Sequence, residues 1–132
     1  GKVVIADRFY DSTIAYQGMA RGIMSSKDIL SLTKKIIGGL TPNLTFYLKI
    51  SPEEAFKRKS KMSEGMDRIE KEGLLFHQKV KEGYDFISNL EKDRFYILDA
   101  TKSPQEIFEE IKKVLNQKIP EYFKDDLSEE KY

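Results

Sequence analysis

A short apolar run near the start of the chain, ended by a charged pair, constrains the fold most. Residues 3–6 are apolar throughout, which predicts a β-strand buried on both faces, as in a parallel sheet. Asp7 and Arg8 follow directly, at the strand end where open α/β sheets bind their ligands. Arg8 can hold a phosphate with its planar guanidinium, and Asp7 can approach a hydrated Mg²⁺. The alternative is an ion pair that merely ends the strand.

The polar side chains that come next have helical spacing. They are Ser12, Thr13, Tyr16 and Gln17. Because they stand about three to five residues apart, a helix would place them on one face. That face would carry two hydroxyls, a phenol and an amide, which can hydrogen-bond to the ring edges and the sugar of a nucleoside.

This stretch resembles the bacterial thymidylate (dTMP) kinases. The family pattern is an aspartate, an arginine and an aromatic residue, then a serine and an alanine-tyrosine-glutamine-glycine run. Here the pattern stands at residues 7–10, 12 and 15–18, and an arginine-glycine pair follows at 21–22. The resemblance continues to about residue 119. It implies an α/β fold of the P-loop NTPase type, in which helices flank a parallel sheet.

The resemblance also implies roles for these residues. Arg8 would hold the phosphate of dTMP, and Asp7 would lie near Mg²⁺ and contact it through water, so both are candidate catalytic residues. The positions that would surround thymine and deoxyribose are Ser12, Thr13, Tyr16 and Gln17. Ser12 has an alternative role as a helix cap. ATP would be the phosphoryl donor.

A cluster of cations lies within residues 57–70. Such a cluster is either a solvated surface or a lid that closes over phosphates, since phosphoryl transfer needs positive charge around the migrating group. The resemblance favours a lid in which Arg58 lies against adenine and Arg68 belongs to the closing motif. Lys59 and Lys61 stand where the family carries a catalytic arginine. A lysine can neutralise charge there, but only as a point donor.

Two further strands are each followed by a capped helix. Residues 44–50 and 95–98 are rich in aromatic and aliphatic side chains, which is typical of strands. A Ser-Pro pair follows each strand, at Ser51 and Ser103, and supplies an N-cap and a first helical residue. This order predicts an α/β sheet with right-handed crossovers. Thr101 matches the family's second adenine-side loop; the alternative is a plain strand-to-helix connection.

Two helices have apolar faces that can be read from spacing. Ser25 can cap a helix that ends at Gly38. Its predicted apolar face is Ile29, Leu30, Leu32, Ile36 and Ile37. A later helix carries a stripe predicted to be core, formed by Phe76, Val80, Tyr84 and Ile87. His77 is predicted to lie on the surface of that helix.

Composition narrows the classes of function. Hydrophobic residues make up 39% and charged residues 34%, a balance typical of soluble globular proteins. A net charge of +1 gives no reason to expect nucleic acid or a membrane surface as a partner. The chain has no cysteine, and its one histidine cannot build a histidine-rich metal site. Without a membrane-length apolar run or a secretory signal, the predicted compartment is the cytoplasm.

One element of the family is missing from the sequence. No Gly-x-x-x-x-Gly-Lys-Ser/Thr string, the loop that holds ATP phosphates, occurs in it. In the family that loop follows an upstream strand, which would lie between the strands predicted at residues 3–6 and 44–50. We therefore expect a gap in the sheet and an incomplete P-loop NTPase-type fold.

These observations lead to one reading and two alternatives. Residues 1–119 would be the C-terminal portion of a nucleoside monophosphate kinase domain, and residues 120–132 a charged tail. The chain alone would be inactive, and the complete protein would be a homodimer that acts on dTMP and ATP with Mg²⁺. One alternative is another nucleotide or nucleoside kinase of the same fold. The other is a non-catalytic binding or assembly module built on half of the fold.

Overall fold

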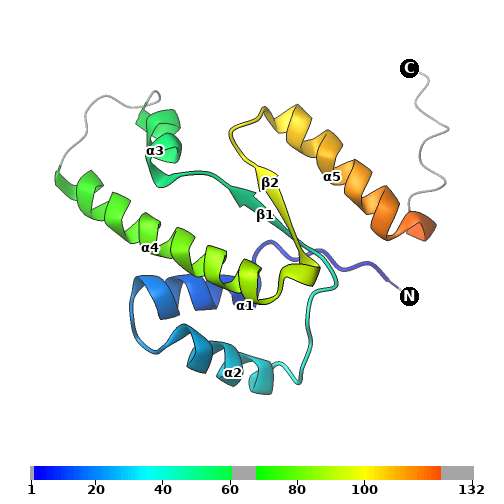
Figure 1. Cartoon of the computed structure of the whole chain (residues 1–132), viewed down its shortest axis with the longest axis horizontal. Coiled ribbons are helices and arrows are strands. Elements are labelled where there is room, and N and C mark those ends of the chain that lie inside the picture. The colour runs from blue at the N-terminus through cyan, green and yellow to red at the C-terminus, as the bar shows by residue number, and fades with distance from the viewer. Residues whose placement is uncertain (1, 61–67, 123–132) are drawn as a thin grey trace.

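The computed structural model describes the backbone of residues 2–60 and 68–122, and the side chains of residues 2–58 and 73–122 (Figure 1). Within these ranges, helices accompany two strands. The elements in chain order are α1 (Tyr10–Thr13), a π-helix (Ile14–Ala20), α2 (Ser26–Ile36), β1 (Thr45–Lys49), α3 (Pro52–Ser60), α4 (Arg68–Leu90), a 3-10 helix (Lys92–Arg94), β2 (Phe95–Asp99), α5 (Pro104–Lys118) and a 3-10 helix (Pro120–Tyr122). This order confirms the predicted α/β class.

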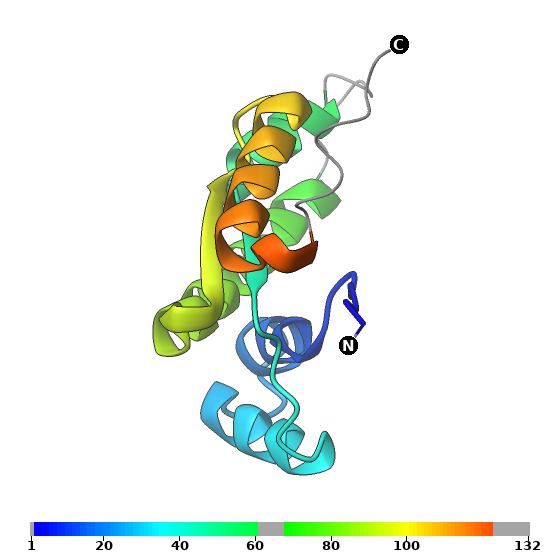
Figure 2. The ribbon, with the colours of Figure 1, turned by 90° about the vertical axis from the view of Figure 1, so that its right-hand side faces the viewer.

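The two strands pair in parallel, as predicted. Thr45 lies opposite Phe95, and Lys49 lies opposite Asp99. A parallel pair needs a crossover connection, which α3 and α4 supply here. The strands lie between α4 on one side and α5 on the other (Figure 1, Figure 2). Both strands therefore end at the same edge of the sheet, where α/β proteins bind their ligands.

The helix ends follow from local sequence chemistry. Ser25 Oγ accepts a hydrogen bond from a backbone N–H of α2, 3.1 Å away, and Ser51 Oγ accepts one from α3 at 3.1 Å. Ser103 and Glu106 form a reciprocal capping box at the start of α5. The turn after α2 contains Gly38 with φ 62°, a conformation that favours glycine. The caps and the helix stop predicted at these positions are confirmed.

The main core lies where α1, the π-helix and α2 meet α4. The buried side chains that cluster there are Tyr10, Ile14, Ile29, Leu30 and Ile87. The π-helix and α4 approach so closely that a Cβ at Gly83 would lie 2.5 Å from the Cα of Ala15. Only glycine fits this contact without a shift of backbone. The close approach places the segment after Arg8 directly on α4.

The strand predicted at residues 3–6 is wrong for this structure. The segment is irregular, and its apolar side chains face solvent: Val4 is 85% exposed and Ile5 is 92% exposed. A strand needs a neighbouring backbone to take up its hydrogen bonds. In the described part of the chain the sheet consists of β1 and β2 alone, so residues 3–6 have no strand beside them.

The predicted apolar face of α2 is correct only in part. Leu30 is buried and Ile37 packs against the core, but Leu32 is 48% exposed and Ile36 is 75% exposed. Leu30, Lys34 and Ile37 follow the i, i+4, i+7 spacing of a single face. Lys34 forms an ion pair with Glu91, the residue that follows α4. Leu32 lies on the side of the helix opposite Leu30, because about 100° separates successive residues of a helix. Ile36 is exposed although it stands seven residues after Ile29, which is buried.

The predicted stripe on α4 largely forms core, as expected. Val80 is 6% exposed and Ile87 is fully buried, whereas Phe76 and Tyr84 are half-buried. His77 is exposed, as predicted. Among the described residues, no helix is both long enough and apolar enough to cross a membrane.

Candidate nucleotide site

Arg8 lies in the loop just before α1, with its backbone in an unusual conformation. Its φ of 65° makes it the one non-glycine residue with a positive φ in the described ranges, and such a conformation is costly for a side chain with a Cβ. The guanidinium carbon of Arg8 lies 5.5 Å from the centroid of the Tyr16 ring. At this distance the cation is attracted to the ring face. The structure thus brings together two of the predicted site residues.

The other predicted site residues of this stretch differ in their contacts and exposure. Ser12 Oγ lies 2.7 Å from the hydroxyl of Tyr84 on α4, and the Tyr16 ring also packs on α4. Thr13, in contrast, is exposed, and Gln17 is half-buried. The structure has a π-helix after α1, and the shared face of these four residues stays a prediction. The wider turns of a π-helix change which positions align.

Tyr84 connects this segment to the sheet. Its ring stacks on Tyr47 of β1 with 5.5 Å between centroids, while its hydroxyl meets Ser12. Burial raises the pKa of Tyr84 above its usual 10.0. The sequence indicates for Tyr84 only a place in the core. Its contact with Ser12 joins residues 72 positions apart, and no local pattern indicates such a pairing.

Arg58 of α3 and the loop after β2 form a second part of the candidate site. Arg58 donates hydrogen bonds to the carbonyl oxygens of Ala100 at 2.8 Å and of Thr101 at 2.7 Å. The loop itself is braced by Asp99, whose Oδ1 accepts from the backbone N–H of Thr101 at 2.9 Å and from its hydroxyl at 2.6 Å. These hydrogen bonds, with the hydroxyl contributing most, hold the pKa of Asp99 below its ordinary value. Arg58 and the loop that contains Thr101 are therefore in contact.

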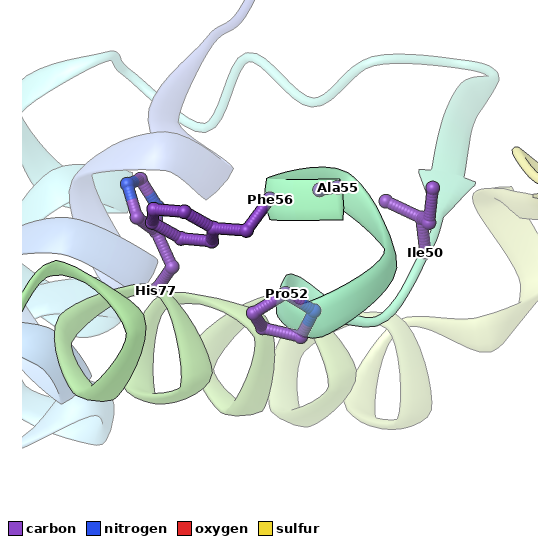
Figure 3. A pocket seen from close by; sticks show the side chains of 5 residues that line it. All are labelled: Ile50, Pro52, Ala55, Phe56 and His77. Atoms are coloured by element: carbon purple, nitrogen blue, oxygen red, sulfur yellow. The ribbon is translucent and has the colours of Figure 1, made fainter. Parts of the chain in front are cut away.

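A small apolar cavity of about 340 Å³ opens where β1 ends (Figure 3). Its lining residues come from the end of β1, from α3 and from α4: Ile50, Pro52, Ala55, Phe56 and His77. The rings of Phe56 and His77 meet edge to face at 5.7 Å, and His77 also meets Phe76 at 5.7 Å. Because Phe76 contacts Tyr16, a continuous row of rings joins the Arg8 region to the carboxyl end of β1.

Several predicted site residues lie partly or wholly outside the described residues. Lys61 lies outside the described residues. For Lys59 and Arg68 the structure describes the backbone but not the side chain. Asp7 is described and is exposed. Within the described ranges, no three His, Asp or Glu side chains gather in a way that would hold a metal ion.

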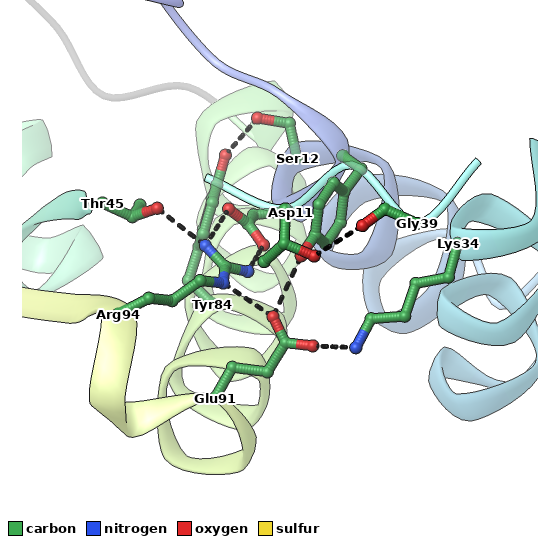
Figure 4. A network of polar contacts seen from close by, with 10 residues as sticks. Asp11, Ser12, Lys34, Gly39, Thr45, Tyr84, Glu91 and Arg94 are labelled. Carbon is green, nitrogen blue, oxygen red and sulfur yellow. Dashed lines mark hydrogen bonds and ion pairs between the residues drawn. The ribbon is translucent and has the colours of Figure 1, made fainter. Parts of the chain in front are cut away.

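A buried polar network beneath α1 was not predicted from the sequence (Figure 4). Its centre is Arg94, just before β2, which is 7% exposed and ion-paired with Asp11 of α1. Arg94 also pairs with Glu91, which in turn pairs with Lys34 of α2. An isolated arginine between α4 and a strand carries no sequence signal of burial, because arginine usually lies at the surface.

The network predicts how stability depends on pH. Burial raises the pKa of Glu91, but hydrogen bonds from Lys34, Arg94 and Tyr10 outweigh it, and the net pKa lies below the ordinary 4.5. The unfolded chain therefore takes up this proton at a higher pH than the folded chain. The stabilisation is complete above the ordinary pKa and is lost as the pH falls through the lowered one.

We expect the free energy of unfolding to fall as the pH is lowered from 7 through the ordinary pKa of this carboxyl group and below it. Urea denaturation followed by circular dichroism across this range measures the slope. Glu91→Gln should flatten the slope and lower stability at pH 7. An unchanged slope in Glu91→Gln would show that other carboxyl groups cause the acid sensitivity.

Fold and site together define a class of protein. A parallel pair of strands lies between helices, and a loop held by an arginine follows the second strand. This arrangement defines an α/β protein, a class that binds its ligands at the carboxyl ends of the strands. Comparison with known proteins narrows the class. A sequence model described as "Thymidylate kinase" matches residues 1–111. The chain belongs to the thymidylate kinase family, whose fold is of the P-loop NTPase type.

Three relatives show the extent of the similarity. A thymidylate kinase of Mesoplasma florum is 46% identical over 120 residues, which cover 90% of this chain and 56% of the relative. The thymidylate kinase of Chlorobium luteolum is 44% identical over 129 residues, covering 92% and 60%. That of Bacillus velezensis is 38% identical over 120 residues, covering 90% and 56%. The chain thus spans somewhat more than half the length of the curated relatives that it matches.

Proposed function

We propose that this chain carries the dTMP site and the lid of a thymidylate kinase. The complete protein would transfer the γ-phosphoryl group of ATP to a phosphate oxygen of dTMP, which gives dTDP and ADP. Residues 1–119 would form the C-terminal portion of the kinase domain, with the lid at about 57–70 and a charged tail at 120–132. Membership of the family supports this reaction.

The observation that carries the proposal is the geometry of Arg8. Its guanidinium lies over the Tyr16 ring, immediately before the helix that bears the other polar candidates. A guanidinium offers a planar set of donors that fits phosphate oxygens two at a time. Arg8 would hold the phosphate of dTMP in the orientation that in-line transfer requires, since such transfer depends chiefly on positioning and charge.

The base and the sugar would occupy the surface beside Arg8. Thr13 is exposed and Gln17 is half-buried, so a hydroxyl and an amide are available to the ring edges of thymine. The Tyr16 ring would lie along the deoxyribose, where it disfavours a 2′-hydroxyl. Ser12 is bonded to Tyr84, which supports a role in holding the helix in place more than direct contact with the base.

The ATP side of the site is only partly present in this chain. Arg58 is held against the loop that contains Thr101 by two hydrogen bonds, and this flat guanidinium suits contact with adenine. Lys59, Lys61 and Arg68 would bring positive charge to the phosphates when the lid closes. The loop that cradles the ATP phosphates in this fold has no counterpart in the sequence, so an N-terminal segment would have to supply it.

Asp7 is the residue that would serve Mg²⁺. The ion usually keeps several waters and binds through one or two carboxylates together with substrate phosphates. One exposed carboxylate near the phosphate-holding arginine fits that donor set. The ion would neutralise charge on the phosphates, while Asp7 would hold its waters. We also propose that the complete protein acts in the cytoplasm as a homodimer.

Binding and turnover measurements test the proposal. Titration calorimetry of the chain with dTMP, thymidine, dCMP and dAMP should show the tightest binding for dTMP. A coupled assay with ATP, MgCl₂ and dTMP should show no turnover by the chain alone. Adding the separately expressed N-terminal segment of the Mesoplasma florum relative should restore dTDP formation.

The turnover assay and the binding titrations each test a separate part of the proposal. Turnover by the chain alone would show that no further segment is needed. Equal binding of all four ligands would remove the assignment of the dTMP site. Preference for dCMP or dAMP would favour another kinase of the same fold.

A further inference from the structure

We infer that Arg94 is a positioning residue that clamps the start of α1 and thereby fixes Arg8 in its binding conformation. This role rests on the proposed function, in which Arg8 holds the phosphate of dTMP. Arg94 lies 86 positions along the chain from Arg8 and touches no candidate ligand group. Its effect would pass through Tyr10 and Asp11, the second and third residues after Arg8.

Every side of the Arg94 guanidinium is in use. Its two terminal nitrogens donate to the two carboxylate oxygens of Asp11, at 2.5 and 3.1 Å. One of them also donates to Thr45 Oγ1 at 2.7 Å, and Nε donates to Glu91 at 2.7 Å. The rings of Tyr10 and Phe95 lie 5.1 and 4.4 Å from the guanidinium carbon. Figure 4 shows the converging polar contacts.

Burial restricts the ion pair between Arg94 and Asp11 to a narrow range of geometries. Arg94 is 7% exposed and Asp11 is 5% exposed. A buried charge is tolerated only when it is paired and hydrogen-bonded. Burial alone would lower the pKa of Arg94, but the hydrogen bonds to Asp11 and Glu91 raise it. The paired groups therefore have one favourable arrangement, which a point-like ammonium cannot reproduce.

Only Phe9 separates Arg8 from the clamped residues. Tyr10 is held by its ring against Arg94 and by its hydroxyl, which donates to Glu91 at 3.0 Å. Phe9 accepts a hydrogen bond at its carbonyl from the first turn of α1, 3.1 Å away. The positive φ of Arg8 is a strained conformation, and strain persists only where the surrounding structure determines it. The clamp supplies that constraint from the C-terminal side.

The network also fixes the position of α1 relative to the sheet. Thr45 and Phe95 are the first residues of β1 and β2 and lie opposite each other. Arg94 bonds to the first and packs on the second. One side chain thus joins the helix that follows Arg8 to the start of both strands, so the position of Arg8 is set relative to the sheet and not only to its own loop.

Arg94→Lys tests the role, with thymidine as the comparison ligand. Thymidine lacks the phosphate that Arg8 would hold. We expect dTMP affinity to fall about tenfold, because a misplaced group loses most of its contribution, while thymidine affinity stays within about twofold. Partial unfolding would lower both affinities equally. Arg8→Gln marks the full phosphate effect, and Lys35→Gln, at an exposed position of α2, should leave both affinities unchanged.

Nuclear magnetic resonance supplies a readout that needs no ligand. The Arg8 side-chain signals should be shifted by the Tyr16 ring in the parent and should move towards random-coil positions in Arg94→Lys. Methyl signals of Ile87 and Leu98, both fully buried, should stay in place if the core is intact. If Arg94→Lys does not fold, Asp11→Asn, which keeps the size of the partner, replaces it in both measurements.

The outcomes separate this role from the proposed function. Selective loss of dTMP affinity together with displaced Arg8 signals supports the clamp. Equal losses for dTMP and thymidine, or unchanged Arg8 signals in a folded variant, overturn it while leaving the dTMP site standing. If the parent binds neither ligand, the proposed function fails, and the Arg8 signals alone decide whether Arg94 holds the loop.

Discussion

Replacing Arg8 by glutamine should weaken dTMP binding by about 10- to 100-fold and leave thymidine binding nearly unchanged. Hydrogen bonds to a charged group contribute roughly 1.5–3 kcal/mol, and about 1.4 kcal/mol corresponds to a factor of ten. Arg8 lies on the Tyr16 ring at the start of the candidate site, so its phosphate contact would be lost without a change in the core. Titration calorimetry with both ligands measures the effect.

A matched control removes the same charge elsewhere. Lys35 of α2 is exposed, and Lys35→Gln should change neither affinity. If Arg8→Gln and Lys35→Gln weakened dTMP binding equally, general electrostatic attraction would explain the result, and Arg8 would not be a specific phosphate ligand.

The second large effect concerns packing, not ligand binding. Gly83→Ala should destabilise the chain by about 2 kcal/mol, the usual cost of overfilling a packed contact. The added Cβ would stand 2.5 Å from the Cα of Ala15 and 3.1 Å from the Cβ of Met19. Helix propensity acts in the opposite direction, because alanine is favoured over glycine by about 1 kcal/mol in a helix interior. Loss of stability would therefore report the close approach of the π-helix to α4.

Gly73 in the same helix is the control. A Cβ there would meet only the Phe56 ring, at 3.6 Å, an ordinary contact. Gly73→Ala should therefore gain up to about 1 kcal/mol from helix propensity. Urea denaturation of both variants gives the comparison. A Gly83→Ala variant as stable as Gly73→Ala would mean that the two helices can separate without cost.

Elements whose chemistry is local were predictable from the sequence. The caps at Ser25, Ser51 and Ser103 act on backbone groups within three residues, so short patterns suffice to identify them. The strands at β1 and β2 are similarly evident from their apolar and aromatic runs. The family, too, could be identified from the run that follows Arg8, and the comparisons confirm it.

The structure brings some of the predicted site residues into contact and leaves the roles of others as predictions. Arg8 with Tyr16, and Arg58 with the Thr101 loop, are in contact. The polar residues that follow Arg8 fall on α1 and a π-helix, and their shared ligand-facing side stays a prediction. The close approach of the π-helix to α4 at Gly83 joins segments far apart in the chain, so local spacing does not indicate it. The roles of Lys59, Lys61 and Arg68 stay predictions.

The family, the α/β class and the positions of the helix caps could be predicted from the amino-acid sequence, because these features depend on residues close together in the chain. The tertiary structure alone decided two other features. Residues 3–6 form no strand, because pairing requires a neighbouring backbone that local apolarity cannot supply. Arg94 is buried beneath α1, because its acceptors on Asp11 and Thr45 come from 83 and 49 positions away. Both outcomes depend on contacts between distant segments, which only the folded chain brings together.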